Sequence, residues 1–361
     1  MPTHANTTRM VRLRAEMRRR KWPALLVSHL PSVRYLCGFT GSNGALLVTQ
    51  RNAVLCTDGR YTVQARQDVH GASVEVPKEP LLAFLGAHAA KLAVGRMAVE
   101  SDHLTVSQYG LLRRAAGRGV KLEPVTGAVE ALRAVKDRSE ISAIRAAAKL
   151  ICGVFDAVVP SIRPGVRELE IAAEVDYQMR RRGAQGPSFE TIVASGPRGA
   201  LPHARPTGRK LRRGELVILD MGAILGGYCS DLTRTVFLGR APARVRGWYG
   251  AVWEAHQAAR GAARPGVACG DVDEAARSAL KRHGLDQYFT HSTGHGIGLE
   301  IHEGPRLARG QKARLEAGNV VTIEPGVYIE GVGGIRIEDD VLITPKGPEV
   351  LTKMCGELLQ L

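Results

Sequence analysis

An internal repeat constrains the fold of this chain more than any other feature of its sequence. Four short patterns occur twice, in the same order and 99 to 104 positions apart: RPGV at 163 and 264, a basic cluster ending in glycine at 181 and 282, His-x-x-Pro at 203 and 302, and a carboxylate on an apolar strand at 220 and 324. A nearly constant offset predicts two copies of one helix–strand unit. An approximate two-fold axis between the copies would place matching residues on both sides of a central cleft.

The residues before the repeat predict a separate, smaller α/β domain. Short apolar runs alternate there with helical patterns, which indicates strands and helices in turn. We expect strands at Ala24–Val27, Ala45–Val48, Ala53–Cys56, Met97–Val99 and Lys121–Val125, and helices at Val11–Arg20, Pro80–Val94 and Thr105–Ala116. The length of 361 residues fits two domains. We place them at residues 1–130 and 131–361, the second opening with a long helix at Ser139–Val159.

Composition narrows the class of protein. The net charge is +15, but Arg and Lys are spread along the chain without interleaved aromatic residues, so we expect no nucleic-acid partner. No apolar run approaches the roughly 20 residues of a membrane span, and the basic N-terminus lacks the apolar stretch of a secretory signal. The six cysteines are scattered, as in reduced cytosolic proteins. We therefore expect a cytoplasmic protein with no membrane partner.

Two aspartates in the first copy of the repeat are predicted to face each other. Residues 216–239 contain two β-rich runs around Leu225-Gly226-Gly227, which is a hairpin signal. Asp220 and Asp231 are equidistant from this turn, so the hairpin would set them roughly opposite each other, with Cβ atoms about 5 Å apart. Two ionised carboxylates at that separation repel and shift each other's pKa. The pair therefore indicates a bound cation.

The second copy repeats this arrangement. Glu324 and Glu338 are equidistant from a turn at 330–334, and strand alternation puts Arg336 on the face of Glu338. Four converging carboxylates suit hard or borderline divalent cations such as Mn²⁺, Co²⁺ or Zn²⁺. His295 lies between two glycines, where the backbone can approach a metal closely. Its nitrogen favours transition metals over Ca²⁺ or Mg²⁺.

These residues resemble the pita-bread metallopeptidases, in the branch that contains aminopeptidase P and prolidase. The matching segments are LDMGA at 219–223, SDLTRT at 230–235, HSTGHGIGLEIHE at 291–303, IEPGVY at 323–328 and GIRIED at 334–339. The resemblance implies an α+β fold, in which a pita-bread catalytic domain contains the pseudo-two-fold repeat. A creatinase-like α/β N-terminal domain would precede it, and the segments GFTGSNG at 38–44 and TDGRY at 57–61 are similar to that domain more weakly.

The resemblance also implies a dinuclear metal centre. Two divalent metal ions per subunit, with manganese preferred and cobalt or zinc as alternatives, would be held by five ligands: Asp220, Asp231, His295, Glu324 and Glu338. The ions would lower the pKa of water and supply hydroxide at neutral pH. His203 and His302 would contact the scissile carbonyl, and His291 and Arg336 would help hold the substrate and the charge network of the site. Glu324 would also shuttle the proton.

The enzymes that this chain resembles cleave the bond before proline. We expect an Xaa-Pro aminopeptidase, because the TDGRY stretch is more similar to that side, acting as a homodimer on peptides with proline at the second position. The alternative is an Xaa-Pro dipeptidase (prolidase) restricted to dipeptides. The N-terminal domain argues against a methionine aminopeptidase. The complete ligand set argues against creatinase and against a catalytically inactive binding or chaperone relative, which is the remote alternative.

Overall fold

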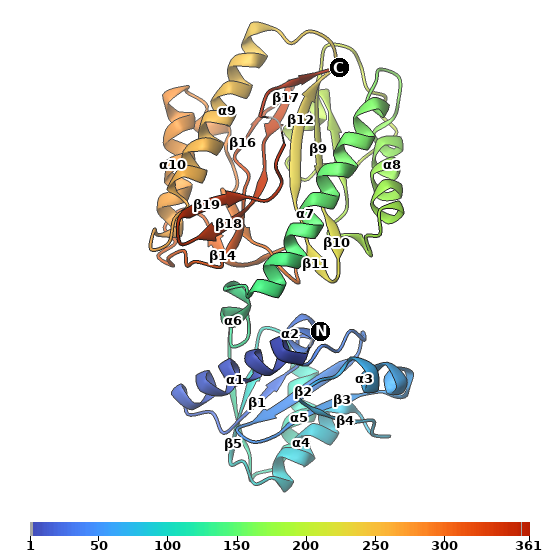
Figure 1. The fold of residues 1–361 in the computed structure, drawn as a ribbon, viewed down its shortest axis with the longest axis vertical. Helices are drawn as coiled ribbons and strands as arrows, with labels where there is room; N and C mark the ends of the chain where they lie inside the picture. Colours follow the sequence, from blue (N-terminus) through green and yellow to red (C-terminus); the bar gives the residue numbers. More distant parts are fainter. Residues whose placement is uncertain (1–2, 355) are drawn as a thin grey trace. The chain divides into compact units, whose positions relative to one another are not determined.

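The computed structural model describes residues 3–354 and 356–361 (Figure 1). The chain forms two compact units, and the boundary between them in the sequence falls between Arg133 and Ala134. The boundary that the sequence suggests, after residue 130, falls at the start of helix α6 (Glu130–Ala134). No helix among the described residues is long and apolar enough to cross a membrane.

The first unit is a six-stranded mixed sheet with helices packed on it. The strands run in the order β4-β3-β2-β1-β5-β6. Their bounds are β1 (Ala24–Val27), β2 (Gly44–Thr49), β3 (Ala53–Thr57), β4 (Ser73–Glu75), β5 (Arg96–Glu100) and β6 (Lys121–Val125). The helices are α1 (Thr3–Arg19), α2 (Leu30–Cys37), η1 (Gly59–Tyr61), α3 (Thr62–Asp68), α4 (Leu81–Lys91) and α5 (Val106–Ala116). Leu85 of α4 and Leu112 of α5 lie in one buried core with Leu26 and Leu47 of the sheet.

The five strands expected in the first unit are confirmed to within one residue at each end. The three expected helices are also present, although α1 begins earlier than its apolar pattern suggests. The sequence analysis missed α2, α3 and β4. Helix α2 has only eight residues, so it is shorter than the window of roughly 11–18 residues over which a helical period can be recognised.

The second unit consists of two similar halves. The first half contains α7 (Arg138–Val158), η2 (Val159–Ser161), α8 (Glu168–Arg181), β7 (Gly186–Pro187), β8 (Ile192–Ser195), η3 (Gly196–Ala200), β9 (Leu216–Met221), β10 (Ala223–Leu225), β11 (Tyr228–Cys229) and β12 (Leu232–Phe237). The second half contains α9 (Ala243–Ala262), α10 (Cys269–Arg282), η4 (Asp286–Tyr288), β13 (Gly294–Gly296), β14 (Glu303–Leu307), β15 (Val320–Ile323), β16 (Gly326–Ile329), β17 (Gly333–Arg336), β18 (Asp339–Thr344), β19 (Gly347–Val350) and β20 (Leu359–Gln360). The helix expected at Ser139–Val159 is therefore confirmed as α7.

The backbone pairing confirms the internal repeat. Helices α8 and α10 begin and end 101 residues apart. The residue before α8, Arg167, forms an isolated antiparallel bridge with Lys210, and its counterpart Ala268 forms the same bridge with Arg314. The two main sheets have the orders β20-β12-β9-β8 and β14-β13-β15-β18-β19. Helices α7 and α8 share a core with the strands of the first half, and α9 and α10 share one mainly with those of the second (Figure 1).

The two hairpins differ in how well their register was predicted. In the second half, Ile323 pairs with Asp339, so Glu324 and Glu338 occupy the next matching position, as expected. In the first half, Asp220 pairs with Thr233. Asp231 lies two residues before Thr233, the partner of Asp220, so the expectation that the two aspartates stand roughly opposite each other is wrong. They are diagonal neighbours on one face, which still places both carboxylates on the same side of the hairpin.

Close backbone packing at β13 explains the glycines that flank His295. A Cβ added at Gly294 would clash with the carbonyl oxygen of Thr322, and one at Gly296 would clash with that of Gly304. Strand β13 can therefore pair with both β14 and β15 only where these two positions carry no side chain.

The Gly294→Ala variant should lose stability because backbone rather than a flexible side chain occupies the space. We expect a loss of at least about 1–3 kcal/mol in the free energy of unfolding, the usual cost of overpacking. The control is Gly250→Ala on the exposed face of α9, where a Cβ meets nothing within 4 Å. That variant should gain up to about 1 kcal/mol from helix propensity. Denaturant unfolding of both variants checks this, and equal stabilities would contradict the packing at β13.

Candidate metal centre

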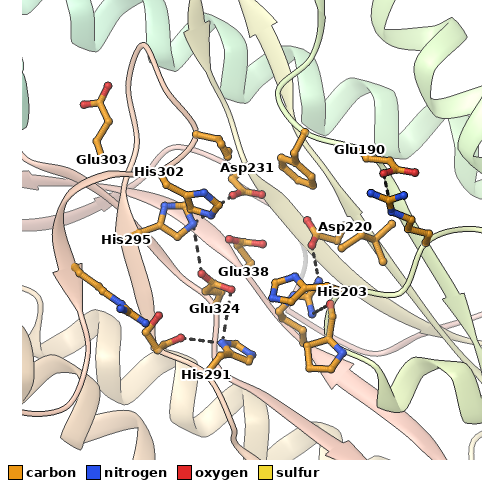
Figure 2. A pocket seen from close by; sticks show the side chains of 18 residues that line it. Glu190, His203, Asp220, Asp231, His291, His295, His302, Glu303, Glu324 and Glu338 are labelled. Atoms are coloured by element: carbon orange, nitrogen blue, oxygen red, sulfur yellow. Dashed lines mark hydrogen bonds and ion pairs between the residues drawn. The ribbon is translucent and has the colours of Figure 1, made fainter. Parts of the chain in front are cut away.

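A cavity of about 690 Å³ in the second unit is lined by residues from both halves (Figure 2). It contains all nine residues selected from the sequence: His203, Asp220, Asp231, His291, His295, His302, Glu324, Arg336 and Glu338. The first-half residues come from the loop after η3, from β9 and from the start of β12. The second-half residues lie on or beside β13 to β18. Residues up to 135 positions apart in the sequence thus meet in one place.

Three side chains form the most compact group of possible metal ligands. One ligand atom each of Asp231, His295 and Glu338 lies within 4.8 Å of the other two. The Nε2 atom of His295 is also 3.5 Å from Oε1 of Glu324. Its Nδ1–H donates to the Gly296 carbonyl oxygen at 3.0 Å, which leaves the Nε2 lone pair directed at the carboxylates. This is the tautomer that a metal ligand requires.

Negative charge gathers in this cavity without a matching number of hydrogen-bond donors. Burial and the neighbouring Glu338 and Asp220 raise the pKa of Asp231 well above its usual range. Burial and the neighbouring Glu324 raise the pKa of Glu338 in the same way. One oxygen each of Asp220 and Asp231 is buried with no hydrogen-bond partner among the described residues. Buried polar atoms are rarely left unpaired, so these orphaned oxygens fit a bound cation.

A chain of hydrogen bonds links Asp220 to His291. Arg336 donates through Nη2 to Oδ2 of Asp220 at 2.5 Å and through Nη1 to the Tyr328 hydroxyl oxygen at 2.7 Å. The Tyr328 O–H in turn lies 2.8 Å from Nε2 of His291, whose Nδ1–H donates to the Ser292 carbonyl at 2.8 Å. Burial, with Arg336 nearby, lowers the pKa of His291 to about 4. His291 is therefore a neutral member of this network, with neither nitrogen free to bind a metal.

Two other histidines reach the cavity with more exposed rings. The ring of His302 lies edge-on to that of His295, with centroids 4.4 Å apart. Burial and the neighbouring His203 lower the pKa of His302. His203 lines the same cavity from the loop after η3 (Figure 2). The lowered pKa of His302 favours a neutral imidazole, which can donate a hydrogen bond to a substrate carbonyl without adding positive charge beside the metal ligands.

A buried ion pair on α10 holds the segment that carries His291. Arg277 donates to Asp273 at 2.7 Å, and also to the carbonyl oxygens of Phe289 and His291. Asp273 accepts from both the backbone N–H and the hydroxyl of Thr293. The ion pair thus fixes the chain on both sides of His291, and this segment leads directly into β13.

The sequence analysis missed several residues of this site. Tyr328 lies on the face of Glu324 by strand alternation, which was a usable signal. Arg306 lines the cavity, is exposed, and forms no ion pair with a described residue, whereas Arg205 pairs with Glu190 at 3.0 Å. Nothing in the local sequence distinguishes Arg306 from the many other arginines of the chain. Its place in the cavity is evident only once the strands are assembled.

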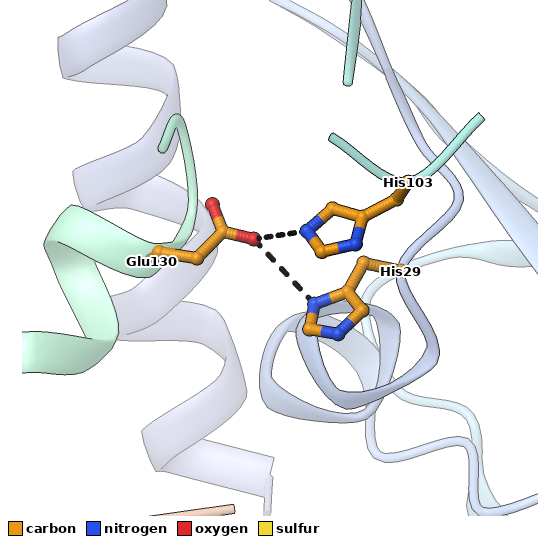
Figure 3. Close-up of side chains that lie close together, drawn as sticks. All are labelled: His29, His103 and Glu130. Carbon is orange, nitrogen blue, oxygen red and sulfur yellow. Dashed lines mark hydrogen bonds and ion pairs between the residues drawn. The ribbon is translucent and has the colours of Figure 1, made fainter. Parts of the chain in front are cut away.

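A second cluster of ligand-type side chains lies in the first unit (Figure 3). Nδ1 of His29 and Nε2 of His103 lie 3.5 and 3.1 Å from the same Glu130 oxygen. Their rings stack at 3.8 Å and are nearly parallel, so their in-plane lone pairs cannot converge on one ion. The buried Arg133 guanidinium also lies 3.3 Å from Nδ1 of His29. We interpret this cluster as a hydrogen-bonded network and assign it no metal.

Comparison with known proteins agrees with the geometry of the cavity. Residues 142–345 match the metallopeptidase family M24, and residues 9–135 match the creatinase/prolidase N-terminal domain. The chain is 34% identical to an Xaa-Pro dipeptidase of Pyrococcus horikoshii, over 93% of this chain and 94% of that protein.

Solved structures agree as well. An Xaa-Pro dipeptidase from Bacillus anthracis superimposes with a TM-score of 0.95 at 37% identity, covering 99% of this chain and all of that one. An X-Pro aminopeptidase from Thermotoga maritima superimposes with a TM-score of 0.89 at 36% identity, covering 96% of this chain and all of that one. The resemblance deduced from the motifs and the pita-bread fold are both confirmed, and the protein is a peptidase that belongs to metallopeptidase family M24.

Proposed function

We propose that this protein hydrolyses the peptide bond before proline with two bound divalent metal ions, and that its substrates are Xaa-Pro dipeptides. Two observations carry the metal assignment: ligand atoms of Asp231, His295 and Glu338 lie close together, and one buried oxygen each of Asp220 and Asp231 has no hydrogen-bond partner among the described residues. Five residues would hold the ions: Asp220, Asp231, His295, Glu324 and Glu338. Manganese, cobalt and zinc all suit this mixture of oxygen and nitrogen ligands.

Each residue around the ions has its own role in the proposed reaction. The metals would polarise the scissile carbonyl and lower the pKa of water. Glu324 accepts the proton of the attacking water and returns it to the proline nitrogen, which needs a proton to leave. His302 and His203 donate hydrogen bonds to the carbonyl oxygen as negative charge develops on it. Arg336 keeps Asp220 oriented through its short contact.

The preference for dipeptides rests on Arg306. A dipeptide has a free carboxylate directly after proline, whereas a longer peptide has a neutral amide there. An unpaired, exposed guanidinium at the cavity wall would bind that carboxylate and give the shorter substrate an advantage. Two of the three relatives described above are named Xaa-Pro dipeptidases, which also favours this alternative over the aminopeptidase suggested by the TDGRY stretch.

The test compares Ala-Pro, Ala-Pro-amide and Ala-Pro-Ala as substrates of the manganese-loaded protein. We expect Ala-Pro to be cleaved best. The Arg306→Gln variant should lower kcat/KM for Ala-Pro by about 10- to 100-fold, the usual value of a hydrogen bond to a charged group, and should change the amide little. Arg205→Gln is the matched control, because Arg205 lines the same cavity but already pairs with Glu190.

Each outcome of this comparison is decisive. Equal cleavage of dipeptide and tripeptide would mean an open cleft and an Xaa-Pro aminopeptidase. Equal losses for all three substrates in Arg306→Gln would mean that Arg306 does not bind the free carboxylate of the dipeptide. No cleavage of any of them with manganese, cobalt or zinc would refute proline specificity.

Removal of the metals should destabilise the protein, because the ions offset buried negative charge. We expect the melting temperature to fall on chelation and to recover when Mn²⁺ is added back. The Asp231→Asn variant removes both a ligand and one buried charge. Its metal-free form should melt no lower than the metal-free wild type, and Mn²⁺ should shift its melting temperature far less.

Elemental analysis beside these melting curves checks the assignment. Asp102→Asn, at an exposed position of the first unit, is the control and should bind metal as the wild type does. Stoichiometric binding of two ions together with full activity in Asp231→Asn would exclude Asp231 as a ligand.

A further inference from the structure

The loop that carries His203 is held by one buried carboxylate. Glu168, the first residue of α8, is fully buried and lies outside the cavity. Its Oε1 accepts hydrogen bonds from the backbone N–H of Ser195 at 2.9 Å and from its hydroxyl at 2.7 Å. Its Oε2 accepts from the N–H of Thr207 at 3.0 Å and from its hydroxyl at 2.7 Å. One side chain therefore joins the two ends of the segment 195–207.

A fifth donor comes from within the loop. Nε of Arg198 donates to Oε2 of Glu168 at 3.1 Å, and its Nη2 donates to the carbonyl oxygen of Arg205. Through these two contacts, the Arg198 guanidinium links the Glu168 carboxylate to the backbone at Arg205, just after His203. A carboxylate that accepts five hydrogen bonds is fully satisfied, and its geometry leaves little freedom to the groups around it.

The tip of the loop has further supports of its own, among them a backbone hydrogen bond from Ala204 to Leu201 and the packing of Ala204 against Ile192 and Ala194. The His203 side chain is exposed and makes no hydrogen bond with a described residue. The carbonyl oxygen of Pro202 accepts from Nη1 of Arg336 at 3.2 Å. The backbone of Gly199 packs so closely on Gly334 that a Cβ at either position would clash. These contacts fix the backbone of the tip, and the direction in which His203 enters the cavity depends on them together with how the loop ends are held.

Stability alone is a poor reason for this arrangement. Burying a charged group costs several kcal/mol, and buried charges are often no more stabilising than apolar residues of the same size. A buried carboxylate gains its advantage where one geometry must be selected over others. Here the geometry in question is that of a segment with a cavity-lining histidine near its middle.

We propose that Glu168 is a positioning residue that sets the orientation of His203 through the segment 195–207. The proposal rests on the function proposed above, in which His203 contacts the scissile carbonyl. Glu168 itself touches neither the substrate nor the metals. A small displacement of a well-oriented catalytic group lowers the rate of the chemical step and has less effect on binding.

The Glu168→Gln variant tests this with minimal change of shape. An amide group would direct N–H donors at the donors of Ser195 or Thr207, so one end of the loop would be released. We expect kcat for Ala-Pro to fall by about 100-fold with little change in KM, while two metal ions remain bound. Thr207→Val removes a single hydroxyl donor and should produce a smaller fall in the same direction.

A double-mutant cycle separates positioning from general damage. If Glu168 acts through His203, then Glu168→Gln should cost nothing further in a His203→Ala background. Glu170→Gln is the matched control, because Glu170 lies on the same helix, is exposed, and among the described residues bonds only to Arg167. It should leave kcat unchanged.

Amide hydrogen exchange supplies a measurement that does not require activity. Residues 196–206 should exchange faster in Glu168→Gln than in the wild type, with β13 and α10 unchanged. Unchanged exchange, or an equal loss of kcat with and without His203, would overturn the proposal. Failure of the wild type to cleave any Xaa-Pro substrate would refute the proposed function instead, and the exchange result would still show whether Glu168 holds the loop.

Discussion

Repulsion among four carboxylates is the constraint on which the rest of the second unit depends. Asp220, Asp231 and Glu338 are buried, and the raised pKa values of Asp231 and Glu338 show that the fold alone does not balance their charge. Arg336 offsets part of this charge through Asp220, and divalent cations would offset the remainder. The strands that converge here are therefore selected for the position of their acidic residues as much as for packing.

In both halves of the repeat, a buried carboxylate positions a segment that carries a histidine of the site. In each half, a buried carboxylate on the helix after the RPGV motif reaches into a neighbouring loop. Glu168 on α8 binds the ends of the loop with His203, and Asp273 on α10 binds Thr293, next to the segment with His291. The two residues are not at equivalent positions of the repeat, because Glu168 corresponds to Cys269 and Asp273 to Ala172, so the two halves build similar supports from different positions.

Local patterns predicted most of the fold and the members of the site, but not how they are supported. The second hairpin had the expected register because its turn is centred where the sequence placed it: Val320 pairs with Leu342 and Gly326 with Arg336. In the first hairpin, Leu225 pairs with Tyr228, so the turn is centred between Gly226 and Gly227, one residue beyond the centre that the sequence suggested. A shift of one residue in the centre moves the predicted partner of Asp220 by two residues, from Thr233 to Asp231.

The contacts of Glu168 join distant parts of the chain, and Arg306 lines the cavity only because the strands bring it there, so no local pattern indicates either role. The expected aminopeptidase activity rested on the similarity of the TDGRY stretch and not on a residue of the cavity.

The contact between Gly199 and Gly334 has a consequence for how this sequence can change. The two glycines belong to different halves of the repeat, and neither position has room for a side chain. A substitution at one cannot be accommodated by adjustment within its own half. The two halves are therefore coupled through these glycines. A chimera that takes one half from a relative would assemble only if both parent proteins have glycine at these two positions.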